Sequence, residues 1–360
     1  MSSNLVIISA IGCIAIAFAI SFVTTPLAIQ ISKRTGALDI PKDNRRMHST
    51  PVPRLGGIAI FISFFICTFV LRAVISEGYL SETDAPELLV KLQAVLIAGT
   101  IIFVLGIIDD VKGMRPVVKL IGQICCAALA FALGVRIPAI TVFGWQFADE
   151  TGVGLFVSFI VTIIWLVAIT NMINLIDGLD GLAAGVVGIA ALAISYSAYI
   201  NGYPTAAFSL AVIAGAALGF LPFNFHPAKI FIGDSGAMFL GFALASVSIV
   251  SPAKGATIVA IIAPVIVLGV PLFDIGFAMV RRRLRGQSVF EADKGHLHHQ
   301  LTRIGIGQRR AALMLYGISG IMGIAAIVLS RELYLEAIGL FLIAVVFIFV
   351  LIWGWDKKKD

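Results

Sequence analysis

The chain has few charged residues, and this scarcity excludes most classes of soluble protein. Only 13% of its 360 residues are Asp, Glu, Lys or Arg, whereas 59% are hydrophobic. A water-soluble protein of this length could not bury so much apolar surface. The apolar runs do not alternate with polar residues, which excludes a transmembrane β-barrel. We therefore expect an all-α polytopic integral membrane protein.

Cysteine is also scarce, and all four cysteines lie inside apolar runs. Cys13, Cys67, Cys125 and Cys126 show no metal-ligand spacing, so we interpret them as packing residues and expect no disulfide framework. The first apolar run lacks a small-x-small cleavage site, which predicts a membrane span there and not a signal peptide. No repeat, low-complexity tract or second domain interrupts the sequence, which predicts a single transmembrane domain over residues 1–360.

Eleven apolar stretches are long enough to cross the hydrocarbon core, which takes about 20 helical residues. They cover residues 5–31, 56–75, 90–108, 116–134, 153–170, 183–200, 204–221, 236–251, 256–280, 311–329 and 333–354. The seventh begins at Pro204, which suits a first helical turn. Residues 135–150 contain alternating apolar positions and predict a hairpin outside the membrane.

The basic residues orient these spans. With an odd number of spans the two ends of the chain lie on opposite sides of the membrane. If the C-terminal Lys357–Lys359 face the cytoplasm, 21 of the 26 Lys and Arg residues fall on cytoplasmic segments. Cytoplasmic loops are enriched in Lys and Arg. The sequence therefore predicts an external N-terminus and a cytoplasmic C-terminus.

The aspartates at the ends of the spans sort to the same side, although they were not used to set the orientation. Two short outer loops contain Glu77, Glu82, Asp84, Glu87, Asp149 and Glu150, which we interpret as ordinary solvated residues. The predicted cytoplasmic side carries Asp39, Asp109, Asp110, Asp177, Asp180, Asp234, Asp274 and Asp293. Carboxylates at the ends of membrane spans are energetically costly and usually functional. We expect them to form one catalytic site from five cytoplasmic segments, namely 32–54, 109–115, 171–182, 222–235 and 281–310.

The densest polar group follows an apolar run and recurs every third residue, at Asn171, Asn174, Asp177 and Asp180. Over nine residues an ideal helix rotates its face by about half a turn, so these side chains form a fan. Gly178 and Gly181 predict that the helix ends or turns here. The carboxylates could hold a metal while the asparagines contact a substrate. A plain helix-ending turn is the alternative.

Two other acidic positions carry similar chemistry. The adjacent carboxylates of Asp109 and Asp110 repel each other and need a cation, which a divalent metal or a nearby base (Lys112, Arg115, Lys119) could supply. Asp234 precedes a span that Ser235 could cap, and a helix N-terminus suits phosphate. Residues 221–231 are interpreted as too broken for a helix. Ordinary interface charges and a simple helix cap are the alternatives.

Two basic loops complete the set. Loop 281–310 contains an Arg cluster and then His296, His298 and His299, which suggest metal or phosphate contact. Zinc is left open, but the many aspartates favour Mg²⁺. Loop 32–54 could bind a phosphate head group. The basic charge of both loops is also explained by inside-positive bias or by anionic lipid.

Together these motifs resemble the polyprenyl-phosphate N-acetylhexosamine-1-phosphate transferases. The resemblance rests on five motifs in order: Pro53 to Gly57, Asp109-Asp110, Asn171 to Gly181, Asn224 to Gly236, and Asp293 to His299. The eleven spans and the His-Leu-His-His loop look more like the bacterial GlcNAc-1-phosphate transferases that start teichoic acid and O-antigen synthesis. The phospho-MurNAc-pentapeptide transferases of peptidoglycan synthesis are the alternative branch.

The resemblance implies that undecaprenyl phosphate attacks a UDP-amino sugar, most simply UDP-GlcNAc, at the cytoplasmic face of the bacterial plasma membrane. UMP leaves and a lipid-linked pyrophosphoryl sugar forms. Mg²⁺ is implied as the cofactor, with Mn²⁺ as a substitute. The expected partners are the two substrates and the bilayer; no nucleic acid is expected, and a homodimer is left open.

Motifs and resemblance together assign roles to the polar residues. Catalytic roles are expected for Asp109, Asp110, Asp177 and Asp180. Metal binding is expected for Asp234, Asp110 and Asp177. Substrate contacts are expected for Asn171, Asn174, Asn224, Lys112, Lys119, Asp293, His296, His298 and His299. The lipid phosphate is expected near the first-loop residues Asp39, Arg46, His48 and Arg54.

Three questions stay open at this point. Direct attack is favoured over a covalent aspartyl intermediate, because the nucleophile arrives as an anion. Pro264 and Pro271 predict a bent span beside a groove for the isoprenoid chain. Asp274 is either a member of the site or an interface charge. A proton-coupled transporter is the rival class, but transporter acids usually lie near the midplane at a repeat interface.

Overall fold

The computed structural model describes residues 3–40, 51–76, 85–137, 141–142, 145–146, 152–250 and 306–356, together with Val265, Gly269 and Arg283. Several predictions fall outside these residues: the bend at Pro264 and Pro271, and the roles of Arg46, His48, Asp274, Asp293, His296, His298 and His299.

The long apolar runs form helices, as the hydropathy pattern predicts. In order they are α1 (Ser3–Thr35), α2 (Gly57–Ser76), α3 (Ala85–Lys112), α4 (Pro116–Ala132), α5 (Gly152–Ile176), α6 (Leu182–Ile200), α7 (Pro204–Asn224), α8 (Gly233–Val250), α12 (Gln308–Leu329) and α13 (Tyr334–Asp356). Within the described residues, eight helices are long and apolar enough to span a membrane, and α4 and α13 contain shorter apolar stretches. The chain is thus a mostly helical polytopic membrane protein.

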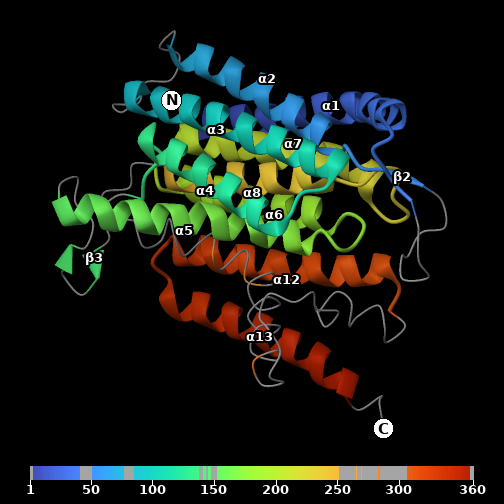
Figure 1. Ribbon diagram of the computed structural model, residues 1–360. Coiled ribbons are helices and arrows are strands. Elements are labelled where there is room, and N and C mark those ends of the chain that lie inside the picture. The colour runs from blue at the N-terminus through green and yellow to red at the C-terminus, as the bar shows by residue number, and fades with distance from the viewer. Residues whose placement is uncertain are drawn as a thin grey trace.

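Two short antiparallel pairs are the strands in the described part of the chain. β1 (Leu38–Asp39) pairs with β2 (Val52–Pro53), and β3 (Thr141–Val142) pairs with β4 (Trp145–Gln146). The second pair confirms the hairpin predicted within residues 135–150. In Figure 1 the β3 hairpin lies at one end of the bundle and β2 at the other end.

Helix α8 lies in the middle of the bundle, among α3, α5 and α7 (Figure 1). Almost all of its residues are buried, because its Gly, Ala and Ser positions let neighbouring backbones approach closely. A Cβ atom at Gly106 of α3 would overlap the backbone of Ser235. The start of α8 is therefore fixed against its neighbours, and this is where the site forms.

The outer helices have the opposite pattern, with large apolar side chains facing outward. Phe156 and Ile164 of α5 and Leu335 of α13 are all more than half exposed. Exposed apolar side chains on hydrogen-bonded helices are typical of a surface that contacts lipid.

Helix α7 continues further than the sequence predicts. It begins at Pro204, as expected, but it ends at Asn224 with Pro222 inside the last turn. The expectation that residues 221–231 are too broken for a helix is therefore wrong for 221–224. The last turn closes despite the proline, because the amide of Phe225 donates to the Leu221 carbonyl at 2.7 Å.

Candidate active site

A short pairing of two extended segments builds one wall of the candidate site. The amide of Phe231 donates to the Pro53 carbonyl at 2.8 Å, and the amides of Gly56 and Gly57 donate back to Phe231 and Ile232 at 3.0 and 2.9 Å. This pairing places Arg54 beside the first residues of α8.

The carboxylate of Asp110 caps helix α8 from the end of α3. Its two oxygens accept hydrogen bonds from the amides of Asp234 and Ser235, at 2.8 and 2.9 Å. The expectation that Ser235 caps this helix is wrong, because the helix begins at Gly233 and the Ser235 hydroxyl lies buried without a partner among the described residues. The close packing at Gly106 explains how a residue of α3 reaches the first turn of α8.

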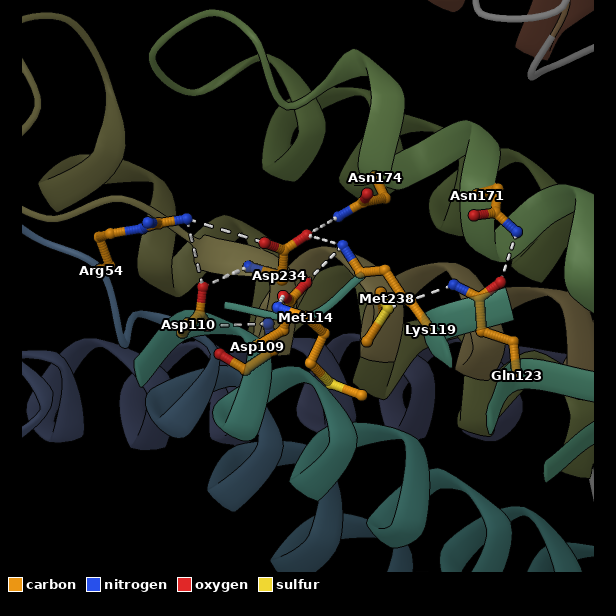
Figure 2. A network of polar contacts seen from close by, with 11 residues as sticks. Arg54, Asp109, Asp110, Met114, Lys119, Gln123, Asn171, Asn174, Asp234 and Met238 are labelled. Atoms are coloured by element: carbon orange, nitrogen blue, oxygen red, sulfur yellow. Dashed lines mark hydrogen bonds and ion pairs between the residues drawn. The ribbon is translucent and has the colours of Figure 1, made fainter. Parts of the chain in front are cut away.

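Two cations neutralise the carboxylates at this helix end (Figure 2). The Lys119 Nζ lies 2.6 Å from Asp109 Oδ2 and 2.6 Å from Asp234 Oδ1. The Arg54 Nη2 lies 3.7 Å from Asp110 and 3.7 Å from Asp234. Of the three bases proposed from the sequence, only Lys119 makes this contact within the described residues.

The other two proposed bases lie outside the network. Lys112 is the last residue of α3 and Arg115 precedes α4, and both are exposed. Besides its contact with Lys119, Asp109 accepts a hydrogen bond from the Met114 amide at 2.6 Å, which fixes the turn between α3 and α4.

The two asparagines of α5 lie at different depths. Asn174 donates to Asp234 Oδ1 at 2.6 Å and so belongs to the carboxylate network. Asn171 donates to Gln123 at 2.5 Å and to the Val167 carbonyl at 2.9 Å, one helical turn further from the carboxylates (Figure 2). Asn171 therefore ties α5 to α4. Sequence reasoning missed Gln123, although its place four residues after Lys119 indicates the same helix face.

The turn after α5 confirms the prediction that the helix ends near the glycines. α5 ends at Ile176, and Gly181 adopts a left-handed conformation (φ 80°) before α6 begins. Asp180 accepts the amide of Ala228 at 3.1 Å and lies 2.7 Å from His226 Nδ1. Asp180 therefore holds the segment between α7 and α8 against this turn, a role that the sequence did not reveal.

Asp177 lies in the same turn, where the charges of Asp234, Asp110 and Arg54 act on its carboxyl group. Burial, followed by the charges of Asp234 and Asp110, raises the pKa of Asp177 well above its ordinary value, while Arg54 acts in the opposite direction. Burial is the larger cause of this raised pKa, and the neighbouring carboxylates add to it.

Asn224 and Asp39 occupy supporting positions. Asn224 is buried and donates to the Ile230 carbonyl at 2.9 Å, while its own side-chain oxygen has no partner among the residues described. Asp39 pairs in register with Val52, on the strand next to the segment that carries Arg54.

The described side chains do not form a ready-made metal cage. No group of three or more His, Cys, Asp or Glu residues in the described ranges could hold a metal ion by itself. Both oxygens of Asp110 accept hydrogen bonds from amides, and Asp234 Oδ1 is held by Lys119 and Asn174, whereas Asp234 Oδ2 faces Arg54 at the longer distance of 3.7 Å. Mg²⁺ typically binds one or two carboxylates together with substrate phosphates, so this donor set fits such an ion.

Comparison with known proteins gives a consistent result. The model of glycosyl transferase family 4 matches residues 92–252. The chain is 38% identical over 342 residues to the probable undecaprenyl-phosphate N-acetylglucosaminyl 1-phosphate transferase of Bacillus subtilis (strain 168), covering 94% of this chain and 90% of the relative. It is 36% identical over 332 residues to the decaprenyl-phosphate N-acetylglucosaminephosphotransferase of Mycobacterium tuberculosis (strain ATCC 25618 / H37Rv), covering 85% and 78%.

A third relative is more distant. The chain is 30% identical over 311 residues to the phospho-N-acetylmuramoyl-pentapeptide-transferase of Bacillus subtilis (strain 168), covering 79% of this chain and 87% of the relative. The resemblance inferred from the five motifs is therefore confirmed, and the chain belongs to glycosyl transferase family 4, which includes these polyprenyl-phosphate sugar-1-phosphate transferases.

Proposed function

We propose that this protein transfers GlcNAc-1-phosphate from UDP-GlcNAc to undecaprenyl phosphate and so starts the synthesis of a lipid-linked cell-envelope polysaccharide. The observation that carries the proposal is the network of Asp109, Asp110 and Asp234 with Lys119 and Arg54, which gathers distant segments at one end of the bundle. The names of the relatives from Bacillus subtilis and Mycobacterium tuberculosis support GlcNAc-1-phosphate as the transferred group and a polyprenyl phosphate as the acceptor.

The chemistry needs positioning and charge neutralisation more than covalent help from the protein. An oxygen of the lipid phosphate forms a bond to the sugar-bearing phosphorus, the bond from that phosphorus to the bridging oxygen breaks, and UMP leaves with that oxygen. Lys119 and Arg54 would attract the phosphate groups, while Asp234 and Asp177 would hold Mg²⁺. When bound, that ion would neutralise charge on the diphosphate.

The lipid phosphate is an effective nucleophile once it loses its last proton, at a pKa of about 6. Asp109 is the proposed acceptor of that proton, since Lys119 and the Met114 amide hold its carboxylate in place. Direct attack by the phosphate remains the preferred path. The alternative needs a free aspartate nucleophile, whereas both oxygens of Asp110 already accept backbone hydrogen bonds.

The proposed setting is a bacterial plasma membrane, with eleven spans and the site at the cytoplasmic face. Its support is the distribution of Lys and Arg. The start of α1 and the end of α13 lie at opposite ends of the bundle, as that topology requires (Figure 1). Labelling of single cysteines introduced beside β2 or β3 with a membrane-impermeant reagent tests this orientation.

The proposal is tested with purified protein in detergent, radiolabelled UDP-GlcNAc, undecaprenyl phosphate and Mg²⁺. UMP release should require both the lipid and the metal, and Asp234→Asn should abolish it. Glu336→Gln is the matched control, because it removes a carboxylate from the first turn of α13. Turnover of UDP-MurNAc-pentapeptide in place of UDP-GlcNAc would favour the peptidoglycan branch, and solute flux in proteoliposomes without UMP release would favour a transporter.

A further inference from the structure

Helix α12 (Gln308–Leu329) brings the hydroxyl of Tyr316 to the region of the candidate site. This hydroxyl donates a hydrogen bond of 2.6 Å to the carbonyl of Gly181, across 135 residues of sequence. α12 lies beyond the residues that match the family model. Neither the motifs nor the carboxylate network includes Tyr316.

The backbone of α6 is shaped to receive this ring. Gly181 has a positive φ of 80°, and its carbonyl also accepts the amide of Gly185 at 2.9 Å. A Cβ atom at Gly185 would overlap the ring of Tyr316. Two donors therefore hold the Gly181 carbonyl, one from within α6 and one from α12.

Tyr316 also contacts the second segment that frames the site. Its ring centroid lies 6.4 Å from that of Phe225, the residue that follows α7. The guanidinium of Arg309, from the first turn of α12, lies over the ring of Phe225, 5.7 Å from its centroid. Asp180, in the 177–181 turn, also contacts His226, in the segment between α7 and α8. One face of α12 thus contacts both the 177–181 turn and the start of the 225–232 segment.

We propose that Tyr316 is a positioning residue for the transfer reaction: its hydroxyl fixes the Gly181 carbonyl and thereby aims the turn that carries Asp177 and Asp180. This inference rests on the proposed function, because the turn carries Asp177, which is proposed to help hold Mg²⁺ beside the diphosphate of the nucleotide sugar. Tyr316 itself acts through the backbone and is not proposed to touch either substrate.

The test is Tyr316→Phe, which keeps the ring and removes only the hydroxyl. Loss of one hydrogen bond should lower kcat/KM for UDP-GlcNAc by roughly three- to tenfold, while the KM for undecaprenyl phosphate stays within about twofold. Tyr196→Phe is the matched control. The Tyr196 hydroxyl accepts a bond from Arg331 at 3.1 Å, and along α6 it lies about 20 Å from Gly181.

Hydrogen–deuterium exchange gives a readout that does not depend on turnover. In Tyr316→Phe the amides of residues 178–185 should exchange at least about threefold faster, with other helices unchanged. Gly185→Ala, which forces the ring away, should show the same local increase. Equal exchange and equal kinetics in Tyr316→Phe and Tyr196→Phe would overturn the proposal.

A second outcome would also overturn it. If Tyr316→Phe raised exchange across all helices and the KM of both substrates together, the hydroxyl would serve global stability and not the turn. Failure of the proposed function is distinguishable from both results. In that case the wild-type protein itself would release no UMP from UDP-GlcNAc, whereas the exchange experiment would still report on the turn.

Discussion

Replacing Lys119 with Met tests how the site balances its charges. The Lys119 ammonium lies 2.6 Å from both Asp109 and Asp234, and 17% of the Lys119 side chain is exposed. Met keeps the apolar stem and removes the charge, so Arg54, at 3.7 Å from Asp234, is the cation that remains in the network. Removing one partner of a fully buried pair costs about 3–5 kcal/mol, and partial exposure lowers our expectation to about 2–3 kcal/mol.

The assay is thermal unfolding in detergent, with and without Mg²⁺, beside the transfer assay. Without metal the Tm of Lys119→Met should fall by roughly 5 °C. Added Mg²⁺ should raise the Tm of the variant by more than it raises the Tm of the wild type, because the ammonium no longer competes for Asp234. Transfer should nevertheless fall by roughly a hundredfold, because a positive charge that stabilises the transition state is lost.

Lys112→Met is the control, since it removes an exposed lysine at the end of α3. It should change the Tm by less than about 1 °C. Lys119→Arg keeps the charge and should recover most of the stability. If Lys119→Met unfolded at the same temperature as Lys112→Met and kept wild-type transfer activity, the contacts of Lys119 would carry no energetic weight and the reasoning would be refuted.

Three further predictions concern packing, buried polar groups and pH. Gly106→Ala should push α3 away from Ser235 and lower stability by about 1–3 kcal/mol, measured as a fall in Tm. Asn171→Leu should cost about 1–3 kcal/mol, because the buried side-chain oxygen of Gln123 loses the donor that Asn171 supplies; urea or SDS unfolding measures this change. Asp177 has a raised folded-state pKa, so the folded protein binds more protons than the unfolded chain, and the free energy of unfolding in EDTA should fall as pH rises from about 4 through the raised value. Asp177→Asn should remove that part of the pH dependence.

Each of these has a control within the chain. Gly12→Ala should be neutral, because nothing lies within 4 Å of a Cβ atom there. The double variant Asn171→Leu with Gln123→Leu should be more stable than Asn171→Leu alone, because no polar group is then left unpaired. A stability of Asp177→Asn that followed the wild-type pH curve in EDTA would contradict the assignment of the raised pKa.

The helices could be predicted because the membrane penalises any other use of such long apolar runs. Ten of the eleven predicted spans coincide with helices in the described residues. The gathering of Asp109, Asp110 and Asp234 could also be anticipated, since carboxylates at span ends need partners. What a linear pattern cannot supply is the partner itself. The Asp110 carboxylate lies 124 residues from the amide it caps.

The roles of Asp180, Gln123 and Tyr316 were missed for the same reason. Asp180 has the sequence signature of a catalytic acid, but its carboxylate bonds to Ala228 and His226. Tyr316 stands alone in an apolar helix, where a tyrosine usually indicates packing, and its hydrogen bond depends on how α12 docks on α6. Tertiary contacts decide these roles, and local sequence carries little information about them.

The use of Asp110 as a cap changes how an anionic substrate must be recognised. The sequence suggested that the N-terminus of α8 would receive a phosphate, but Asp110 takes the amides of Asp234 and Ser235 and shields that end of the helix dipole. The positive charge of the network then comes from Lys119 and Arg54, against four carboxylates when Asp177 is ionised. Two negative charges are left over when Asp177 is ionised and one when it is protonated, so in either state a diphosphate would be repelled unless a divalent cation entered with it. The charge balance of the described residues therefore supports the proposed metal, which the protein and the nucleotide sugar would bind jointly.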